Sequence, residues 1–399
     1  MKVVVTNIYG KENKGDQALL ESLLSCLHSF NNVKNIFLHA HYTEGLGDYS
    51  DLVTVCKPVN NIEHRYKKLL IPFILLCSYF YAKFPLLFSF TLTRWQKKTV
   101  DSYRHADLII SCPGGFLEDS TKAYFAAIFQ LFLASVFQKK LVIAPQSIGP
   151  INGRISKWLL RNVLVRAEKI YVREQFSYRF LKEEIGIPAQ SISMSADMAF
   201  FYEYKGGRVE QVEIEDRMYS TVVDWNFPAS DDKEAARELY IKSMAEFYKR
   251  VSDDNNVDVV ILNQVSSDLR MARAIKNFTL NERLYIDESH YEPNEMIAKI
   301  GSTRFFVGTR FHSCIFAALA NVPFIAISYL PKTHGIMEYL DLLGYEIDIY
   351  KISCDELLLK YQEMVLAEKV IKSSLQKTLL SIEEKNIFSR ELGRFLNAN

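Results

Sequence analysis

The clearest candidate site in this sequence is the pair Arg310 and His312, which lie two positions apart within the segment 304–313. The apolar run before the pair predicts a strand and the apolar run after it predicts a helix, so both side chains fall where a helix begins. Backbone N–H groups and the helix dipole favour an anion there, and the two side chains add further donors. We therefore predict that this turn binds a small, highly charged anion. In the alternative interpretation, Arg310 forms a structural salt bridge and His312 caps the helix.

Two more cations follow predicted strands. Lys332 comes shortly after the expected strand Phe324–Ser328, and neighbouring parallel strands end at one edge of a sheet. We therefore expect Lys332 to reach the same anion. Arg173 closes the expected strand Ile170–Arg173 on the side of the predicted cleft. It is predicted either to have a functional role there or to form an ion pair with Glu174 or a helix-cap contact.

Two carboxylates, Glu118 and Asp119, come shortly after a pair of glycines, Gly114 and Gly115, beyond the expected strand 108–111. Paired glycines let a ligand approach the backbone closely, and general acid–base catalysis needs a carboxyl group that faces the ligand. We predict that Asp119 is the acid–base group and that Gly114, Gly115 and Glu118 contact a second substrate, the acceptor. The alternative is a solvated turn that caps the following helix.

The loop 9–16 joins the first expected strand to a helix, and it contains no G-x-G-x-x-G pattern, so a dinucleotide site is not indicated. Asp16 lies at the expected helix start, where it either serves as the N-cap or contacts the acceptor. No Walker, H-E-x-x-H or G-x-S-x-G motif is present. His39 and His41 have no carboxylate or cysteine at ligand spacing, so we expect no metal site.

The totals describe a globular intracellular protein. Of the 399 residues 49% are hydrophobic and 24% are charged, and the formal net charge is +1. With no basic stripe, nucleic acid is not an expected partner. Six scattered cysteines without a C-x-x-C pair indicate reduced thiols. The N-terminus shows no signal-peptide pattern, so we expect a cytoplasmic protein.

Short β-rich runs alternate with helical patterns such as Gln17–Phe30 and Asp231–Val251. This alternation predicts parallel sheets, and the length predicts two domains. We predict two Rossmann-like α/β domains, residues 1–205 and 215–399, facing one another across a cleft. The helical run from about Asp355 is long enough to cross back to the first domain. The expected strands are Val3–Ile8, Asn35–Ala40, Leu108–Ser111, Leu141–Ala144, Ile170–Arg173, Ser191–Met194, Thr221–Trp225, Val257–Asn263, Leu284–Asp287, Phe305–Gly308 and Phe324–Ser328, with the linker at 204–217.

The segment 69–95 interrupts this alternation. Residues 69–90 are almost wholly apolar and aromatic, but Lys83 and two prolines break the run, and both flanks are basic. Basic and aromatic flanks suit a helical hairpin that lies in the headgroup region of a membrane. The alternatives are a buried helix pair and a transmembrane span.

Taken together, these segments resemble the polysaccharide pyruvyl transferase family, in order from residue 3 to about 340. Three positions depart from the family pattern: Pro113, Ala196 and Asn321 stand where glycine, proline and glycine are usual. The matching pieces are Asn13-Lys14-Gly15-Asp16-Gln17-Ala18-Leu19, Gly114-Gly115 with Asp119, Ala144-Pro145-Gln146-Ser147-Ile148-Gly149-Pro150, Val172-Arg173-Glu174, Ala196-Asp197, Gly308-Thr309-Arg310-Phe311-His312-Ser313 and Tyr329 through Lys332.

The resemblance implies a fold like that of GT-B glycosyltransferases, with the acceptor on the first domain and the donor on the second. It implies phosphoenolpyruvate as co-substrate, no cofactor, and a pyruvate ketal, 4,6-linked, on a hexose of a surface polysaccharide. Residues matching the donor-binding positions are Arg173, Arg310 and His312. If the hexose is lipid-linked, the enzyme works at the cytoplasmic face of the inner membrane, held there by 69–95.

Two other functions stay open from the sequence. A glycosyltransferase that uses a nucleotide sugar would also place basic residues at a helix start of its second domain. A non-catalytic sugar-binding or scaffold protein would tolerate substitution of Arg310 and His312. The sequence does not indicate an oligomeric state.

Overall fold

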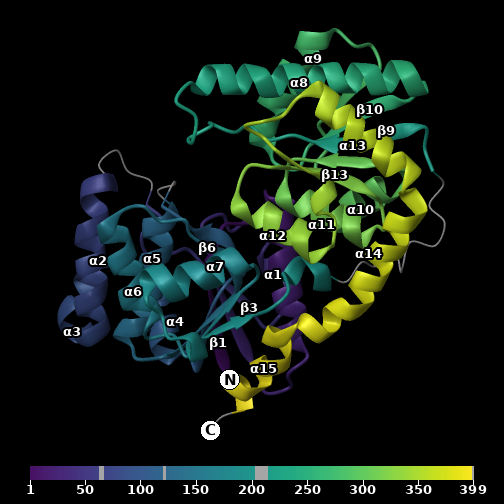
Figure 1. Ribbon diagram of the computed structural model, residues 1–399. Helices are drawn as coiled ribbons and strands as arrows, with labels where there is room; N and C mark the ends of the chain where they lie inside the picture. The colour runs from purple at the N-terminus through teal and green to yellow at the C-terminus, as the bar shows by residue number, and fades with distance from the viewer. Residues whose placement is uncertain (63–66, 120–122, 203–213, 398–399) are drawn as a thin grey trace. The chain divides into compact units, whose positions relative to one another are not determined.

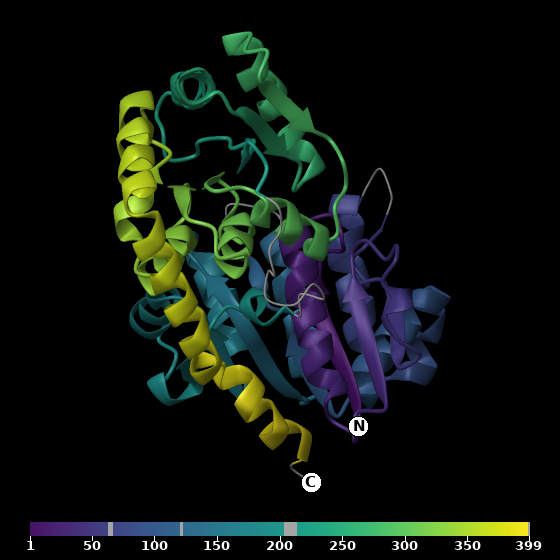
Figure 2. The ribbon, with the colours of Figure 1, turned by 90° about the vertical axis from the view of Figure 1, so that its right-hand side faces the viewer.

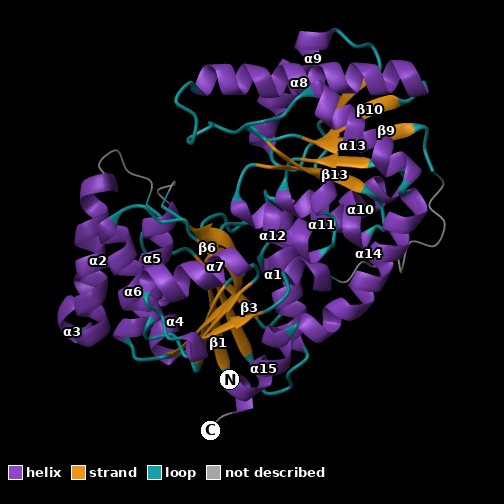
Figure 3. Cartoon of the chain, viewed as in Figure 1, coloured by secondary structure: helices purple, strands orange, loops and turns teal. Residues whose placement is uncertain are grey.

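The computed structural model describes residues 1–62, 67–119, 123–202 and 214–397. The chain separates into two compact units. The first comprises residues 1–11, 16–201 and 384–399, and the second comprises residues 12–15 and 202–383. Each unit contains one parallel sheet with helices on both faces (Figures 1 and 3). The prediction of two parallel-sheet α/β domains is therefore confirmed.

The first unit is built on an eight-stranded parallel sheet. The order is β3-β2-β1-β4-β6-β7-β8, and β5 pairs with β6. After its first residue, β1 is buried along its whole length, as expected for a strand covered on both faces. The strands are β1 (Lys2–Ile8), β2 (Asn35–Ala40), β3 (Val53–Cys56), β4 (Leu108–Ser111), β5 (Gly114–Leu117), β6 (Lys140–Ile148), β7 (Lys169–Val172) and β8 (Ile192–Met194).

The helices of this unit come from both ends of the chain. They are α1 (Lys14–His28), α2 (Lys67–Lys83), α3 (Pro85–Phe88), α4 (Arg94–His105), α5 (Ala123–Val136), α6 (Arg154–Leu164), α7 (Gln175–Arg179) and α15 (Ile387–Asn397). The Tyr171 hydroxyl donates to Glu391 on α15 at 2.6 Å, and Asn32 Nδ2 donates to the Leu396 carbonyl at 2.8 Å. Both chain ends accordingly lie at the same end of the first unit (Figures 1 and 2).

The second unit has a six-stranded parallel sheet in the order β11-β10-β9-β12-β13-β14. The strand order reverses between β9 and β12, which is the position where open α/β sheets bind ligands. The strands are β9 (Arg217–Thr221), β10 (Asp258–Leu262), β11 (Leu284–Asp287), β12 (Phe306–Gly308), β13 (Phe324–Ser328) and β14 (Glu346–Asp348). The helices are α8 (Lys233–Asn255), α9 (Leu269–Thr279), α10 (Pro293–Gly301), α11 (Phe311–Leu319), α12 (Pro331–Tyr339), α13 (Cys354–Leu366) and α14 (Glu368–Ile382).

One predicted strand is wrong. The apolar pair Val222 and Val223 suggested a strand at Thr221–Trp225, but β9 ends at Thr221, where its pairing with β12 stops. The sequence analysis also missed β3, β5 and β14. Most of the predicted linker, residues 204–213, lies outside the described residues.

The apolar segment forms α2 and α3, and its two faces differ. Cys77, Tyr81 and Ala82 are buried, and α2 contacts α4 and α5. Other apolar side chains of the segment are exposed: Leu86 on α3 is 94% exposed, and Phe90 in the turn after α3 is 85% exposed. No helix in the described ranges is long and apolar enough to cross a bilayer. The buried side chains therefore fit the predicted helix packing. Contact of the exposed apolar side chains with lipid stays a prediction.

His39 on β2 makes the stability of the fold sensitive to acid. Burial lowers the pKa of His39 to about 3, and its Nε2 contacts the Ser102 hydroxyl at 2.8 Å. The unfolded chain binds a proton near pH 6.5, so stability falls as the pH drops from about 6.5 towards 3, by up to about 1.4 kcal/mol per pH unit.

We predict that His39→Gln shows a shallower loss of stability between pH 7 and pH 5 than the wild type, as measured by urea unfolding. His105 is exposed, so His105→Gln is the matched control and keeps the wild-type slope. Equal slopes in all three proteins would contradict the assignment.

Candidate functional site

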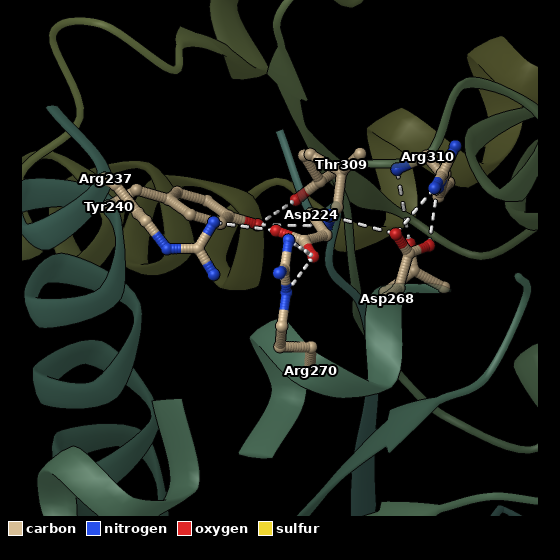
Figure 4. Close-up of polar contacts among 9 residues, drawn as sticks. Asp224, Arg237, Tyr240, Asp268, Arg270, Thr309 and Arg310 are labelled. Carbon is tan, nitrogen blue, oxygen red and sulfur yellow. Dashed lines mark hydrogen bonds and ion pairs between the residues drawn. The ribbon is translucent and has the colours of Figure 1, made fainter. Parts of the chain in front are cut away.

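The candidate site lies at the carboxyl edge of the second sheet, around its switch point. Asp224 follows β9, Asp268 follows β10, and Arg310 follows β12. Because carboxyl ends of parallel strands meet at one edge, three loops distant in sequence bring these side chains together (Figure 4).

Arg310 and Asp268 form a two-point ion pair. Arg310 Nε donates to Asp268 Oδ2 at 2.7 Å, and Nη2 donates to Oδ1 at 2.6 Å. The Asp268 side chain is 4% exposed and that of Arg310 is 19% exposed. A paired guanidinium and carboxylate of this geometry fix each other's orientation. The alternative predicted for Arg310, a salt bridge, is therefore present, and it also sets where the guanidinium lies.

A second carboxylate is tied to the first. The backbone N–H of Asp224 donates to Asp268 Oδ1 at 2.9 Å. Asp224 in turn holds two arginines: Arg237 from α8 at 2.7 Å and Arg270 from α9 at 2.6 Å. Three arginines and two carboxylates thus form one connected group (Figure 4).

Buried hydroxyl groups stabilise the turn that carries Arg310. Thr309 Oγ1 shares a hydrogen bond with the Tyr240 hydroxyl at 2.9 Å, and Thr221 Oγ1 shares one with Ser313 at 2.7 Å. Burial raises the pKa of Tyr240, so this hydroxyl stays protonated. The Ser313 hydroxyl also donates to the Arg310 carbonyl at 2.6 Å. Hydrogen bonds thus stabilise the turn both before Arg310, at Thr309, and after it, at Ser313.

The other cations predicted in this half of the chain lie near Arg310. Arg310 is the N-cap residue of α11, and His312 is the second residue of that helix. His312 is 6% exposed, and its ring contacts that of Phe311 with 5.0 Å between centroids. Lys332 lies in the first turn of α12, with Nζ 5.5 Å from the centre of the Phe311 ring. Arg310 and His312 thus follow β12, and Lys332 follows the neighbouring strand β13.

Arg173 belongs to the first unit and is enclosed there. Its side chain is 2% exposed, Nη1 lies 2.5 Å from Asp197 Oδ2, and Nε lies 3.7 Å from Glu174 Oε2. Nε also donates to the Ser147 hydroxyl at 2.9 Å. Burial raises the pKa of Glu174, an effect that nearby Arg173 partly offsets. This arrangement fits the predicted alternative, an ion pair, and does not favour a donor contact.

Asp119 also has a structural task. Its carboxylate accepts hydrogen bonds from the backbone N–H groups of Asn152 and Gly153 at 2.9–3.1 Å, which holds the loop before α6. Gly114 lies in strand β5 rather than in a glycine turn, and a Cβ atom there would lie 2.6 Å from the Phe116 ring. A side chain at position 114 would therefore require the Phe116 ring to move, and contact of Gly114 with an acceptor stays a prediction.

The remaining predicted acceptor contacts lie in the first unit. Gly115 is also part of β5, and Glu118 is half-buried after it. Asp16 lies in the first turn of α1 rather than at its N-cap, because the helix begins at Lys14. The described residues contain no group of three or more His, Cys, Asp and Glu side chains suited to a metal ion.

The sequence analysis missed Asp224, Arg237, Asp268 and Arg270. Asp224 was placed inside a strand, and Asp268 sits in a polar turn without a recognisable motif. A usable signal existed, since both residues follow buried strands within a few positions.

We predict that Arg173→Gln costs about 3–5 kcal/mol of stability, because Asp197 and Glu174 would be left buried without a cation. Urea unfolding measures this loss, and Arg173→Gln combined with Asp197→Asn should recover part of it. A loss of activity in Arg173→Gln at unchanged stability would instead favour the donor contact.

Comparisons with known proteins agree on the fold and on the family. Residues 13–331 match the family described as polysaccharide pyruvyl transferase. The amylovoran biosynthesis protein AmsJ of Erwinia amylovora is 20% identical over 427 residues, covering 98% of both chains.

Solved structures resemble the chain at the level of fold. Anabaena HepE, solved with UDP and glucose, has a TM-score of 0.60 at 10% identity, with both chains fully covered. The UDP-GlcNAc 2-epimerase of Neisseria meningitidis has a TM-score of 0.60 at 11% identity, again with full coverage. Because the family match spans most of the sequence, the chain belongs to the polysaccharide pyruvyl transferase family.

Proposed function

We propose that this protein transfers pyruvate from phosphoenolpyruvate to two hydroxyl groups of a hexose, forming a 4,6-ketal during exopolysaccharide biosynthesis. The family supports a transferase, and AmsJ is named for the biosynthesis of such a polymer. The observation that carries the proposal is that Arg310, His312 and Lys332 all follow the carboxyl ends of β12 and β13, with Arg310 oriented by Asp268.

Phosphoenolpyruvate suits this group because it carries a carboxylate and a phosphate on three carbons. Two of the five N–H donors of the Arg310 guanidinium bind Asp268. This ion pair fixes the orientation of the guanidinium. Each charge-assisted hydrogen bond to the donor contributes about 1.5–3 kcal/mol. Arg310 would bind the donor in two-point fashion, His312 would bind the phosphate, and Lys332 would add a third cation.

The reaction needs a proton at one end of the donor and a leaving group at the other. Protonation of the methylene carbon gives a methyl group and an oxocarbenium carbon, which one sugar hydroxyl attacks. The bond to the phosphate oxygen breaks, and the second hydroxyl closes the ketal. Of the two hydroxyl protons, one replaces the proton given to carbon and the other leaves with phosphate.

The two side chains predicted to transfer protons, Asp119 and His312, differ in their surroundings. Asp119 accepts several backbone hydrogen bonds that hold a loop, so it is the weaker candidate. His312 lies beside Arg310 at the helix start, and in its protonated form it would neutralise and protonate the departing phosphate. We therefore favour His312 as the leaving-group acid.

We predict that phosphoenolpyruvate raises the melting temperature of the wild type and that Arg310→Lys and His312→Ala nearly abolish turnover. Lysine cannot reproduce the two-point contact of Arg310, and ligand binding to the native state alone raises stability. Thermal shift and phosphate release are the measurements. Near wild-type turnover in Arg310→Lys would contradict the two-point contact.

The same thermal shift separates the proposal from its rivals. HepE was solved with UDP and glucose, and a glycosyltransferase of this fold would be stabilised by a nucleotide sugar instead. A scaffold protein would respond to neither ligand. Stabilisation by UDP-, GDP- or dTDP-sugars without a response to phosphoenolpyruvate would favour the glycosyltransferase.

We further propose that the acceptor is lipid-linked and that α2 and α3 bring the enzyme to the membrane surface. Phe73, Leu76 and Leu87 are each more than half exposed, together with Leu86 and Phe90. The exposed cations Arg94 and Lys98 follow on α4. An apolar face beside basic residues fits an anionic lipid surface.

We predict that Leu86→Glu combined with Phe90→Glu releases the protein from anionic vesicles in a sedimentation assay. Leu366 on α13 is 89% exposed, so Leu366→Glu is the control and should still sediment. Unchanged sedimentation of the double variant would count against membrane docking through this face.

A further inference from the structure

We infer that Arg270, which no sequence motif marks, is a second arginine for the anionic donor and contacts one of its oxyanion groups. The inference rests on the proposed function and extends its site from β12 and β13 to the loop after β10. It depends on three observations: how Asp224 holds two arginines, where Arg270 sits on its helix, and how the two carboxylates are connected.

Asp224 forms an ion pair with Arg237 in addition to the one with Arg270. Arg237 Nη1 donates to Asp224 Oδ1 at 2.7 Å, and the Asp224 side chain is 7% exposed. Arg270 uses the other oxygen, with Nε and Nη2 both 2.6 Å from Oδ2. One carboxylate thus faces two guanidinium groups, and the second arginine adds an uncompensated positive charge at the sheet edge.

Arg270 is exposed although its partner is buried. Its side chain is 76% exposed, whereas Arg237 is 21% exposed. Arg237 therefore serves to neutralise Asp224, while most of the Arg270 side chain faces solvent in a fixed direction. A guanidinium held this way loses less conformational entropy when it binds a ligand.

The position of Arg270 on its helix also indicates an anion. It is the second residue of α9, and the N-cap residue Asp268 makes no side-chain cap hydrogen bond and pairs with Arg310 instead. A cation near a helix N-terminus is opposed by the helix dipole. Because Arg237 already neutralises Asp224, an arginine placed against the dipole at this position is a candidate for function. Arg310 occupies the corresponding end of α11, so two helix starts each carry an arginine.

The two arginines are linked through their carboxylates. Arg270 pairs with Asp224, Arg310 pairs with Asp268, and the Asp224 backbone N–H bonds Asp268 Oδ1 at 2.9 Å. Figure 4 shows both guanidinium groups against this connected pair of carboxylates. A small molecule with an anionic group at each end would contact both arginines, and phosphoenolpyruvate has that chemistry.

The experiment compares Arg270→Gln with Arg273→Gln. Arg273 lies on the same helix, is 56% exposed and pairs with exposed Glu288 at 2.7 Å, so it is a matched surface arginine outside the site. Dissociation constants are measured by thermal shift for phosphoenolpyruvate, inorganic phosphate and pyruvate. We expect Arg270→Gln to weaken phosphoenolpyruvate binding by about tenfold or more, and Arg273→Gln to match the wild type.

The two single-group probes show which end of the donor Arg270 contacts. If Arg270→Gln loses affinity only for inorganic phosphate, Arg270 contacts the phosphate end of the donor. If it loses affinity only for pyruvate, Arg270 contacts the carboxylate end. Arg270→Lys should retain part of the affinity for phosphoenolpyruvate. Without ligand, the melting temperatures of Arg270→Gln and Arg270→Lys should equal that of the wild type.

Wild-type affinity in Arg270→Gln, with affinity lost in Arg310→Gln, would overturn this inference and leave the proposed function standing. A wild type that does not bind phosphoenolpyruvate would overturn both. An equal loss in Arg270→Gln and Arg273→Gln would also contradict the inference, because it would indicate a general effect of surface charge.

Discussion

One contact connects three loops of the second unit: the two-point pairing of Arg310 with the buried carboxylate of Asp268. A carboxylate that is 4% exposed needs a partner, since an unpaired buried charge is strongly destabilising. Arg310 supplies that partner from the loop after β12, and in doing so it acquires a fixed direction at the helix start. The carboxylate also accepts the Asp224 N–H. One ion pair thereby fixes the loops after β9, β10 and β12.

Much of the fold could be predicted because buried parallel strands leave a strong signal. Strands β2, β4, β11 and β13 have the predicted bounds, since each is a short apolar run between turn residues. Short or edge strands, β3, β5 and β14, were missed. The error at β9 had a specific cause: Val222 and Val223 are buried at 2% exposure without being in the strand, so apolar character alone shifted the prediction. As a result, Asp224 was predicted to lie within a strand and was not considered as a site residue.

The site could be predicted only in part, because sequence shows residue types but not their partners. Arg310, His312 and Lys332 could be proposed because each follows a recognisable strand. Asp268 was missed because its partner is distant in sequence and its own turn carries no motif. Arg173 and Asp119 were chosen by the same rule, but in the structure Arg173 meets Asp197 and Asp119 meets backbone N–H groups. The rule finds positions at the sheet edge and cannot separate ligand contacts from structural ones.

The proposed function assigns two features of the chain to one reaction: the cations that follow β12 and β13, and the exposed apolar residues of α2 and α3. The claim that joins them is pyruvyl transfer to a sugar. The most direct test is to incubate the protein with phosphoenolpyruvate and a panel of lipid-linked and nucleotide sugars. The account predicts phosphate release that depends on the acceptor, and a product heavier than the acceptor by one pyruvate less one water. Sugar transfer from a nucleotide sugar, with no pyruvylated product, would contradict it.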